Sequence, residues 1–203
     1  MLEASLGWSW LIAVIPVLAF ALIGLYFHRW PRVAAAVSIA AIALSLFLSA
    51  AVAVHVLAQG EGFSYKLAVP WLSMPGLHVD MGVMIDGLAA VMLLVVTIVA
   101  FLVQVYSLGY MRGDPGFASY FAYQSLFAGA MLGLVLSSNF GQIYVFWELV
   151  GLASYLLIGV GFERVSAREA AKKAFITNRI GDFGFLLGIL FLQIVFGTLD
   201  FEG

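Results

Sequence analysis

Three ionisable side chains lie inside stretches of sequence that are otherwise apolar enough to cross a membrane. Glu148 lies eight residues after the start of the apolar run 140–161, and Arg179 and Asp182 lie in the run that ends near residue 196. On membrane-insertion scales, a charged residue at a helix centre costs about 2.5 to 3.5 kcal/mol. A chain keeps such a residue where the charge is used or where a neighbour pairs with it. These residues are therefore the candidate functional site.

Glu148 has the depth and chemistry expected of a proton carrier. It lies about 12 Å from one end of its span and about 20 Å from the other, since a helix rises 1.5 Å per residue. A carboxyl group at this depth is neutral, or ionised when a cation lies nearby. Its protonation would therefore respond to movement of a partner charge. The alternative is a protonated glutamate that only hydrogen-bonds a neighbouring helix.

Arg179 and Asp182 are three residues apart, so they share a helix face and can pair directly. Asp182 lies about 21 Å from the end of its span, a depth comparable to that of Glu148. The pair would then share the function of Glu148 or support that residue directly. The alternative is a self-neutralising pair that only aids insertion.

Weaker candidates lie near these three residues. Lys172 and Lys173 are interface anchors in one interpretation and a proton-loading point in the other. Several side chains could link a water chain or serve only as packing contacts: Tyr144, Ser154, Tyr155 and Asn178.

The composition indicates a polytopic membrane protein. The 203 residues are 64% hydrophobic and 10% charged, whereas soluble domains are about 45–50% apolar and about 25% charged. A net charge of −2 gives no reason to expect nucleic acid as a partner. The absence of cysteine excludes thiolate metal ligands and iron–sulfur ligation within this chain.

Hydropathy predicts an all-α fold with six transmembrane helices. We place them at about 8–27, 33–57, 87–108, 120–136, 140–161 and 167–196, and each approaches or exceeds the roughly 17–25 residues that span a bilayer. A short β-hairpin is predicted between the second and third helices, with strands at 63–69 and 77–85 and turn residues at 70–76.

The loops predict the orientation. Seven of the nine Lys and Arg residues lie in the loops that follow spans one, three and five, and only Lys66 lies on the opposite side. By the positive-inside rule the basic side is cytoplasmic. Both ends of this sequence would then face the opposite, periplasmic compartment.

Local signals predict helix ends and close contacts. Asp86 is placed to cap the third helix. Ser166 and Glu169 have the spacing of a capping box at the start of the sixth, with Glu169 also able to pair with Lys173, and Gly197 is placed to stop that helix. Two GxxxG pairs predict close helix approach: Gly129 with Gly133, and Gly184 with Gly188.

Four segments resemble a known family, the antiporter-like subunit L of respiratory complex I, the NADH–quinone oxidoreductase. They are DGLAAVM at 86–92, SLGYM at 107–111, WELVGLASYLLIG at 147–159 and AAKKAFITNRIGDFGF at 170–185. The resemblance covers about 86–196. It divides the chain into 1–85, two helices with the outer loop, and 86–203, four helices that begin an antiporter-like domain.

The resemblance implies a function and its setting. Glu148 matches the family's proton-carrying glutamate, which pairs with a lysine further along the chain, and Asp182 and Arg179 match residues thought to tune that pair. No cofactor is expected in this chain; NADH, FMN, iron–sulfur clusters and quinone would lie elsewhere in the complex. The expected partners are other membrane-arm subunits and the lipid bilayer, in a bacterial-type inner membrane.

Family members are much longer, so we expect these residues to be part of a longer subunit or one piece of a split one. Two rival functions stay open: a subunit of an Mrp-type cation/proton antiporter, and a non-conducting membrane scaffold fragment.

Overall fold

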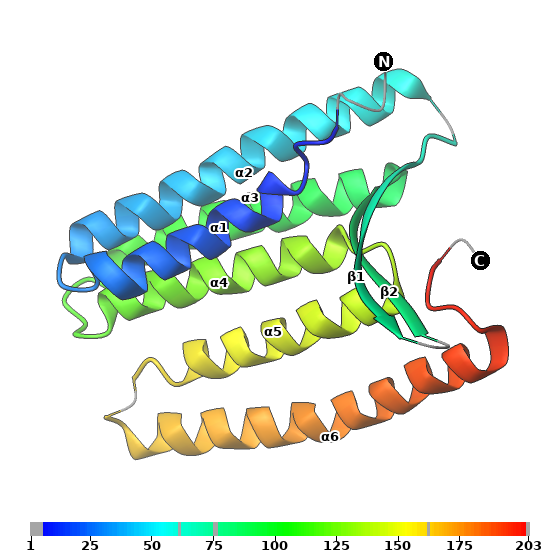
Figure 1. Cartoon of the computed structure of the whole chain (residues 1–203). Coiled ribbons are helices and arrows are strands. Elements are labelled where there is room, and N and C mark those ends of the chain that lie inside the picture. Colours follow the sequence, from blue (N-terminus) through cyan, green and yellow to red (C-terminus); the bar gives the residue numbers. More distant parts are fainter. Residues whose placement is uncertain (1–5, 61, 75–76, 162, 202–203) are drawn as a thin grey trace.

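The computed structural model describes residues 6–60, 62–74, 77–161 and 163–201, and it is mostly helical (Figure 1). The elements in chain order are α1 (Leu11–Leu22), a π-helical continuation η2 (Ile23–Phe27), α2 (Pro31–Gln59), β1 (Tyr65–Met74), β2 (Leu77–Ile85), α3 (Gly87–Tyr110), α4 (Phe117–Val135), α5 (Phe140–Ile158) and α6 (Val165–Phe196).

The membrane-helix fold with a hairpin is confirmed. Helices α2 to α6 are each long and apolar enough to cross a membrane. The first predicted span is shorter than expected, because residues 7–10 form turns and the apolar helix covers only Leu11–Phe27.

Most predicted helix ends are confirmed. The Asp86 side chain accepts a hydrogen bond from the Ala89 backbone N–H at 2.7 Å, which caps α3. Gly197 ends α6 with a φ of 72°, a left-handed conformation that favours glycine. Asn139 caps α5 by accepting from the Gln142 N–H at 2.8 Å, a signal not used in the sequence analysis.

The predicted capping box at the start of α6 is wrong. A turn in which the Arg164 N–H donates to the Gly161 carbonyl at 2.9 Å leads directly into the helix, which begins at Val165. Ser166 therefore already has helical backbone and cannot serve as the N-cap. Glu169 pairs with Lys172 at 3.3 Å and not with Lys173.

The hairpin is confirmed, but its first strand is longer than predicted. β1 and β2 pair antiparallel, and residues 70–74 belong to β1 instead of a turn. Pro70 lies opposite Asp80, with a bulge between Pro70 and Leu72. Proline has no N–H to donate, and a bulge is a place where the ladder tolerates it.

Helix α4 is the centre of the bundle and packs against α1, α2, α3 and α5. A Cβ on Gly129 would lie 2.6 Å from Val17 Cγ2, and one on Gly133 would lie 2.3 Å from the Phe146 ring. The first GxxxG prediction is therefore confirmed. Because α1 and α4 pack together, residues from both sides of the predicted 1–85/86–203 boundary share this bundle, and the division itself stays a prediction.

Helix α6 lies at the edge of the bundle and packs chiefly against α5 (Figure 1). Many of its exposed side chains are large and apolar. A Cβ on Gly184 or Gly188 would meet nothing within 4 Å among the described residues, so the close approach predicted for this pair is wrong within this chain. The glycines of α6 face open space here, whereas those of α4 face neighbouring helices.

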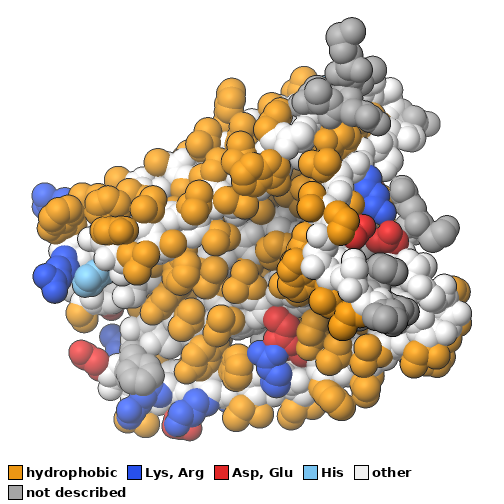
Figure 2. Space-filling model, in the orientation of Figure 1, with side chains coloured by type: hydrophobic (Ala, Val, Ile, Leu, Met, Phe, Trp, Pro, Cys, Tyr) orange, Lys and Arg blue, Asp and Glu red, His pale blue; other side chains and the backbone are white. Residues whose placement is uncertain are grey.

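The two ends of the bundle differ in charge. The loops after η2, α3 and α5 lie at one end, and the hairpin and residues 198–201 lie at the other (Figure 1). Figure 2 shows most of the blue Lys and Arg side chains at the loop end. This confirms the predicted alternation of the loops. At the hairpin end Lys66 pairs with Asp200 at 3.3 Å.

Candidate functional site

The candidate site is formed where α5 and α6 lie side by side. The Arg179 Nη1 of α6 donates to the Glu148 Oε2 of α5, a direct ion pair between the two helices. The same guanidinium lies 4.0 Å from the Asp182 Oδ2, one helical turn further along α6. One cation therefore lies between two carboxylates, and the three residues singled out from the sequence are brought together.

The two carboxylates have different surroundings. The Asp182 side chain is 8% exposed and that of Glu148 is 19% exposed. Asp182 Oδ1 accepts a hydrogen bond from the Trp147 indole N–H at 2.8 Å, while the buried Glu148 Oε1 has no hydrogen-bond partner among the described residues. Among the described residues, Asp182 is therefore held by two groups and Glu148 by Arg179 alone.

Trp147 is a residue of the candidate site that was not predicted from the sequence. Its ring also packs edge-on against Phe185 of α6, with centroids 5.7 Å apart, while the residue is 48% exposed in this chain. The sequence signal was its position beside Glu148: one tryptophan placed mid-span, away from the interfaces where this residue usually anchors a helix. An indole N–H buried at that depth needs an acceptor.

Arg179 lies at the open side of the site. Its side chain is 46% exposed, and its guanidinium carbon lies 4.9 Å from the centroid of the Phe175 ring, one turn earlier on α6. The ring face attracts the cation and holds it without a covalent or ionic constraint. The guanidinium is thus placed to contact either carboxylate by a small side-chain movement.

A cavity of about 480 Å³ adjoins Asp182 between α4, α5 and α6. Trp147 and Asp182 line it together with three polar side chains: Ser154, Thr177 and Asn178. Ser154 and Asn178 are two of the predicted links for a water chain. Of the other two, Tyr155 lines a separate cavity of about 590 Å³ near the loop end, and Tyr144 packs against Phe185.

The two lysines lie apart from this group. Lys172 is exposed, pairs with Glu169 and lines the cavity near the loop end, and Lys173 is also exposed. In the part of the chain that is described, neither lysine is within ion-pair distance of Glu148. Lys172 precedes Arg179 by seven residues, about 10 Å of helix.

Two family models match the sequence. The model described as "NADH-Ubiquinone oxidoreductase (complex I), chain 5 N-terminus" matches residues 71–121. The model described as "NADH:quinone oxidoreductase/Mrp antiporter, TM" matches residues 137–203. The second match contains Glu148, Arg179 and Asp182.

Curated relatives agree with these matches. The NAD(P)H-quinone oxidoreductase chain 5 of Synechocystis sp. is 44% identical over 200 residues, which are 95% of this chain and 29% of the relative. The chloroplastic subunit 5 of Chaetosphaeridium globosum is 51% identical over 142 residues, 70% of this chain and 21% of the relative. The chain thus spans less than a third of the length of either relative.

Solved structures share the fold. A membrane-bound sulfane sulfur reductase, described as an archaeal respiratory membrane complex, aligns with a TM-score of 0.77 at 18% identity over 95% of this chain and 38% of that one. The Mrp complex from Dietzia sp. DQ12-45-1b aligns with a TM-score of 0.75 at 22% identity over 95% of this chain and 20% of that one. Both are parts of multi-subunit membrane assemblies.

Glu148, Arg179 and Asp182 together form an ion group in the middle of two spans. The helix bundle and this ion group define a multi-pass membrane protein of the antiporter-like class. Within that class, one family is indicated by the two matching models, at residues 71–121 and 137–203, and by the relatives at 44% and 51% identity. The chain belongs to the family of antiporter-like subunits of NADH–quinone oxidoreductase, as the resemblance to subunit L predicted.

Proposed function

We propose that this chain supplies the first part of a proton-translocating membrane-arm subunit of an NADH–quinone oxidoreductase, in which Glu148 carries the proton. The observation that carries the proposal is the placement of Arg179 between Glu148 and Asp182, within two membrane-spanning helices. The names of the curated relatives favour this function over the Mrp-type antiporter and the inert scaffold.

The proposed step is a shift of one cation between two carboxylates. With Arg179 on Glu148, the ionised carboxylate has its counter-charge and holds no proton. When the guanidinium moves to Asp182, Glu148 loses the one partner it has among the described residues. A carboxylate without a cation in an apolar span takes up a proton. Asp182 can accept the cation without rearranging, because Trp147 already fixes its carboxylate.

We also propose roles for the lysines of α6, the cavity beside Asp182 and the partner subunits. Lys172 and Lys173, at the basic end of α6, would load protons from the cytoplasm, and the cavity beside Asp182 would hold the water that links the site to its neighbours. NADH oxidation and quinone reduction, with FMN and iron–sulfur clusters, would take place in partner subunits. The membrane would be a bacterial-type inner membrane, with the hairpin on the periplasmic side.

The test is Glu148→Gln in the complete subunit within its membrane complex. We expect NADH-driven acidification of inverted membrane vesicles to fall by about a hundredfold, the lower end of the range for losing one proton-transfer group, with electron transfer to quinone much less affected. The matched control is Glu163→Gln, which changes an exposed glutamate in the loop before α6.

Three outcomes would contradict the proposal. Unchanged pumping in the Glu148 variant would remove the carrier role. Na⁺-dependent transport without an NADH-driven step would favour the cation antiporter, and normal assembly with pumping insensitive to every residue of the ion group would favour the scaffold.

A further inference from the structure

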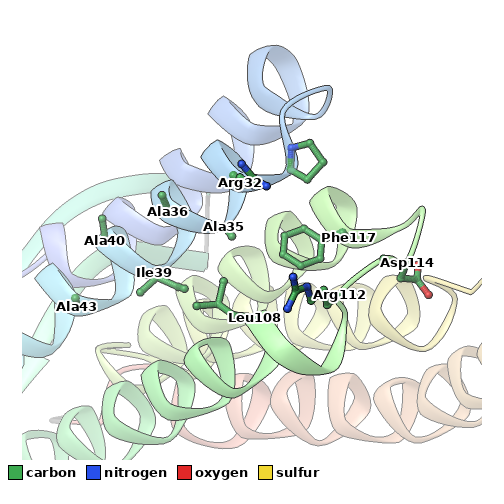
Figure 3. A pocket seen from close by; sticks show the side chains of 12 residues that line it. Arg32, Ala35, Ala36, Ile39, Ala40, Ala43, Leu108, Arg112, Asp114 and Phe117 are labelled. Carbon is green, nitrogen blue, oxygen red and sulfur yellow. The ribbon is translucent and has the colours of Figure 1, made fainter.

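A groove of about 820 Å³ lies between α2 and α3 (Figure 3), whereas the candidate site lies between α5 and α6. Its wall on α2 consists mostly of alanines, including Ala36 and Ala40, together with Ile39. Its wall on α3 includes Leu108. Figure 3 shows Arg32 and Arg112 at the same end of the groove. Arg32 belongs to the first turn of α2, and Arg112 lies in the loop that follows α3. The groove therefore has an apolar floor and a cationic mouth.

The two guanidiniums at the mouth have no counter-charge in the described part of the chain. Both side chains are exposed, and neither is within ion-pair distance of a carboxylate there. Asp114 also lines the groove, but its Oδ1 accepts the Gly116 N–H at 2.7 Å and closes the loop. Lys66, Lys172 and Arg179, by contrast, are each in an ion pair.

The length of the groove fits a lipid acyl chain better than a transmembrane helix of a partner. From Arg32 to Ala43, the deepest α2 residue in the lining, is eleven residues, or about 17 Å of helix. Half of a bilayer's hydrocarbon core is about 15 Å. A packed transmembrane helix from a partner would need a groove across the whole core, whereas an acyl chain occupies one leaflet.

We propose that this groove binds an anionic phospholipid of the leaflet at the basic end. The headgroup phosphate accepts hydrogen bonds from the Arg32 and Arg112 guanidiniums, whose planar donors match phosphate geometry. One acyl chain lies along the alanines of α2 against Leu108. Basic pockets between membrane helices are a known setting for such headgroups. This inference is independent of the proposed proton chemistry, since neither arginine belongs to the ion group.

The test measures lipid retention by native mass spectrometry of the whole chain in detergent, titrated with dioleoyl phosphatidylglycerol and, separately, with dioleoyl phosphatidylcholine. We expect the wild-type chain to hold one phosphatidylglycerol in preference to phosphatidylcholine. The double variant Arg32→Gln/Arg112→Gln should bind phosphatidylglycerol roughly thirtyfold more weakly, because each basic residue near an anionic lipid contributes about fivefold and the two factors multiply. The matched control, Arg29→Gln/Arg164→Gln, removes two exposed charges at the same end outside the groove.

A second variant tests the apolar part without changing charge. Ala40→Trp fills the groove beside α2, and we expect it to lower phosphatidylglycerol binding while the melting temperature in lipid-free detergent stays near that of the wild type. Equal binding by the double variant and its control would overturn the proposal, as would equal binding of the two lipids. Photo-crosslinking from position 40, in the assembled complex, to a protein instead of phospholipid would also overturn it and would place a partner helix in the groove.

Discussion

Arg179 is the residue on which the charge balance of the candidate site depends. It contacts Glu148 directly and lies 4.0 Å from Asp182, so one positive charge serves two acidic groups. Within the described part of the chain, Asp182 has a second partner, the Trp147 indole, and Glu148 has none. Loss of Arg179 should therefore affect Glu148 more than Asp182.

Arg179→Gln tests this difference. We expect Glu148 to become neutral, because a carboxylate in an apolar span without a cation takes up a proton. A hydrophobic carbodiimide reacts with protonated carboxyl groups, so labelling of Glu148, measured by peptide mass spectrometry, should rise several-fold over the wild type. Arg168→Gln, about three turns earlier on α6, is the control. Labelling that stays at the wild-type level would show that Arg179 does not keep Glu148 ionised.

Trp147→Phe tests the second partner of Asp182. The change keeps an aromatic ring but removes the N–H donor, leaving Asp182 Oδ1 without its hydrogen bond. Leaving a buried acceptor unsatisfied costs about 1–3 kcal/mol, so we expect a lower melting temperature in detergent. Trp30→Phe, at an exposed position before α2, should change it little. Equal effects of the two changes would mean that the Trp147 hydrogen bond does not stabilise the fold.

At the scale of the helices, the glycines of α4 and α6 have opposite roles in this chain. Gly133→Ala places a methyl group 2.3 Å from the Phe146 ring, and such overpacking typically costs about 1–3 kcal/mol. Gly184→Ala meets nothing within 4 Å among the described residues and should gain up to about 1 kcal/mol of helix propensity. Melting of the two variants in detergent should therefore shift in opposite directions; a shared direction would contradict the packing of α4 against α5.

Helix positions followed from the sequence because apolar runs of membrane length have few alternatives in a bilayer. Asp86 and Gly197 were predictable for the same kind of reason, since each meets a local need of the backbone at a helix end. The strand through Pro70 and the start of α6 were not. Both depend on how neighbouring turns and ladders continue, which short-range patterns do not specify.

The candidate site likewise has features that the sequence predicts and features that it does not. The cost of burying charge identified Glu148, Arg179 and Asp182 from the sequence alone. It did not show that Arg179 would pair across to Glu148 in preference to its own helix neighbour, because this depends on the register of α5 against α6. Trp147 was missed because its role is set by a residue 35 positions away.

At the scale of the whole molecule, the orientation in the membrane is open to direct measurement. The chain has no cysteine, so single cysteines can be labelled without background. We expect Ser73→Cys, exposed in the hairpin, to react with a membrane-impermeant maleimide in cells with a permeabilised outer membrane. Arg164→Cys, in the loop before α6, should react only after the inner membrane is opened. The reverse pattern would invert the predicted topology.

The pairing of Arg179 with Glu148 also has a consequence for how the chain enters the membrane during synthesis. Helix α5 leaves the ribosome before α6 and carries a carboxyl group whose cation has not yet been made. Each charge alone would cost a few kcal/mol in lipid, but a hairpin of α5 and α6 that enters together is already neutralised across its two arms. The insertion machinery should therefore retain α5 until α6 arrives and release the two helices as a unit.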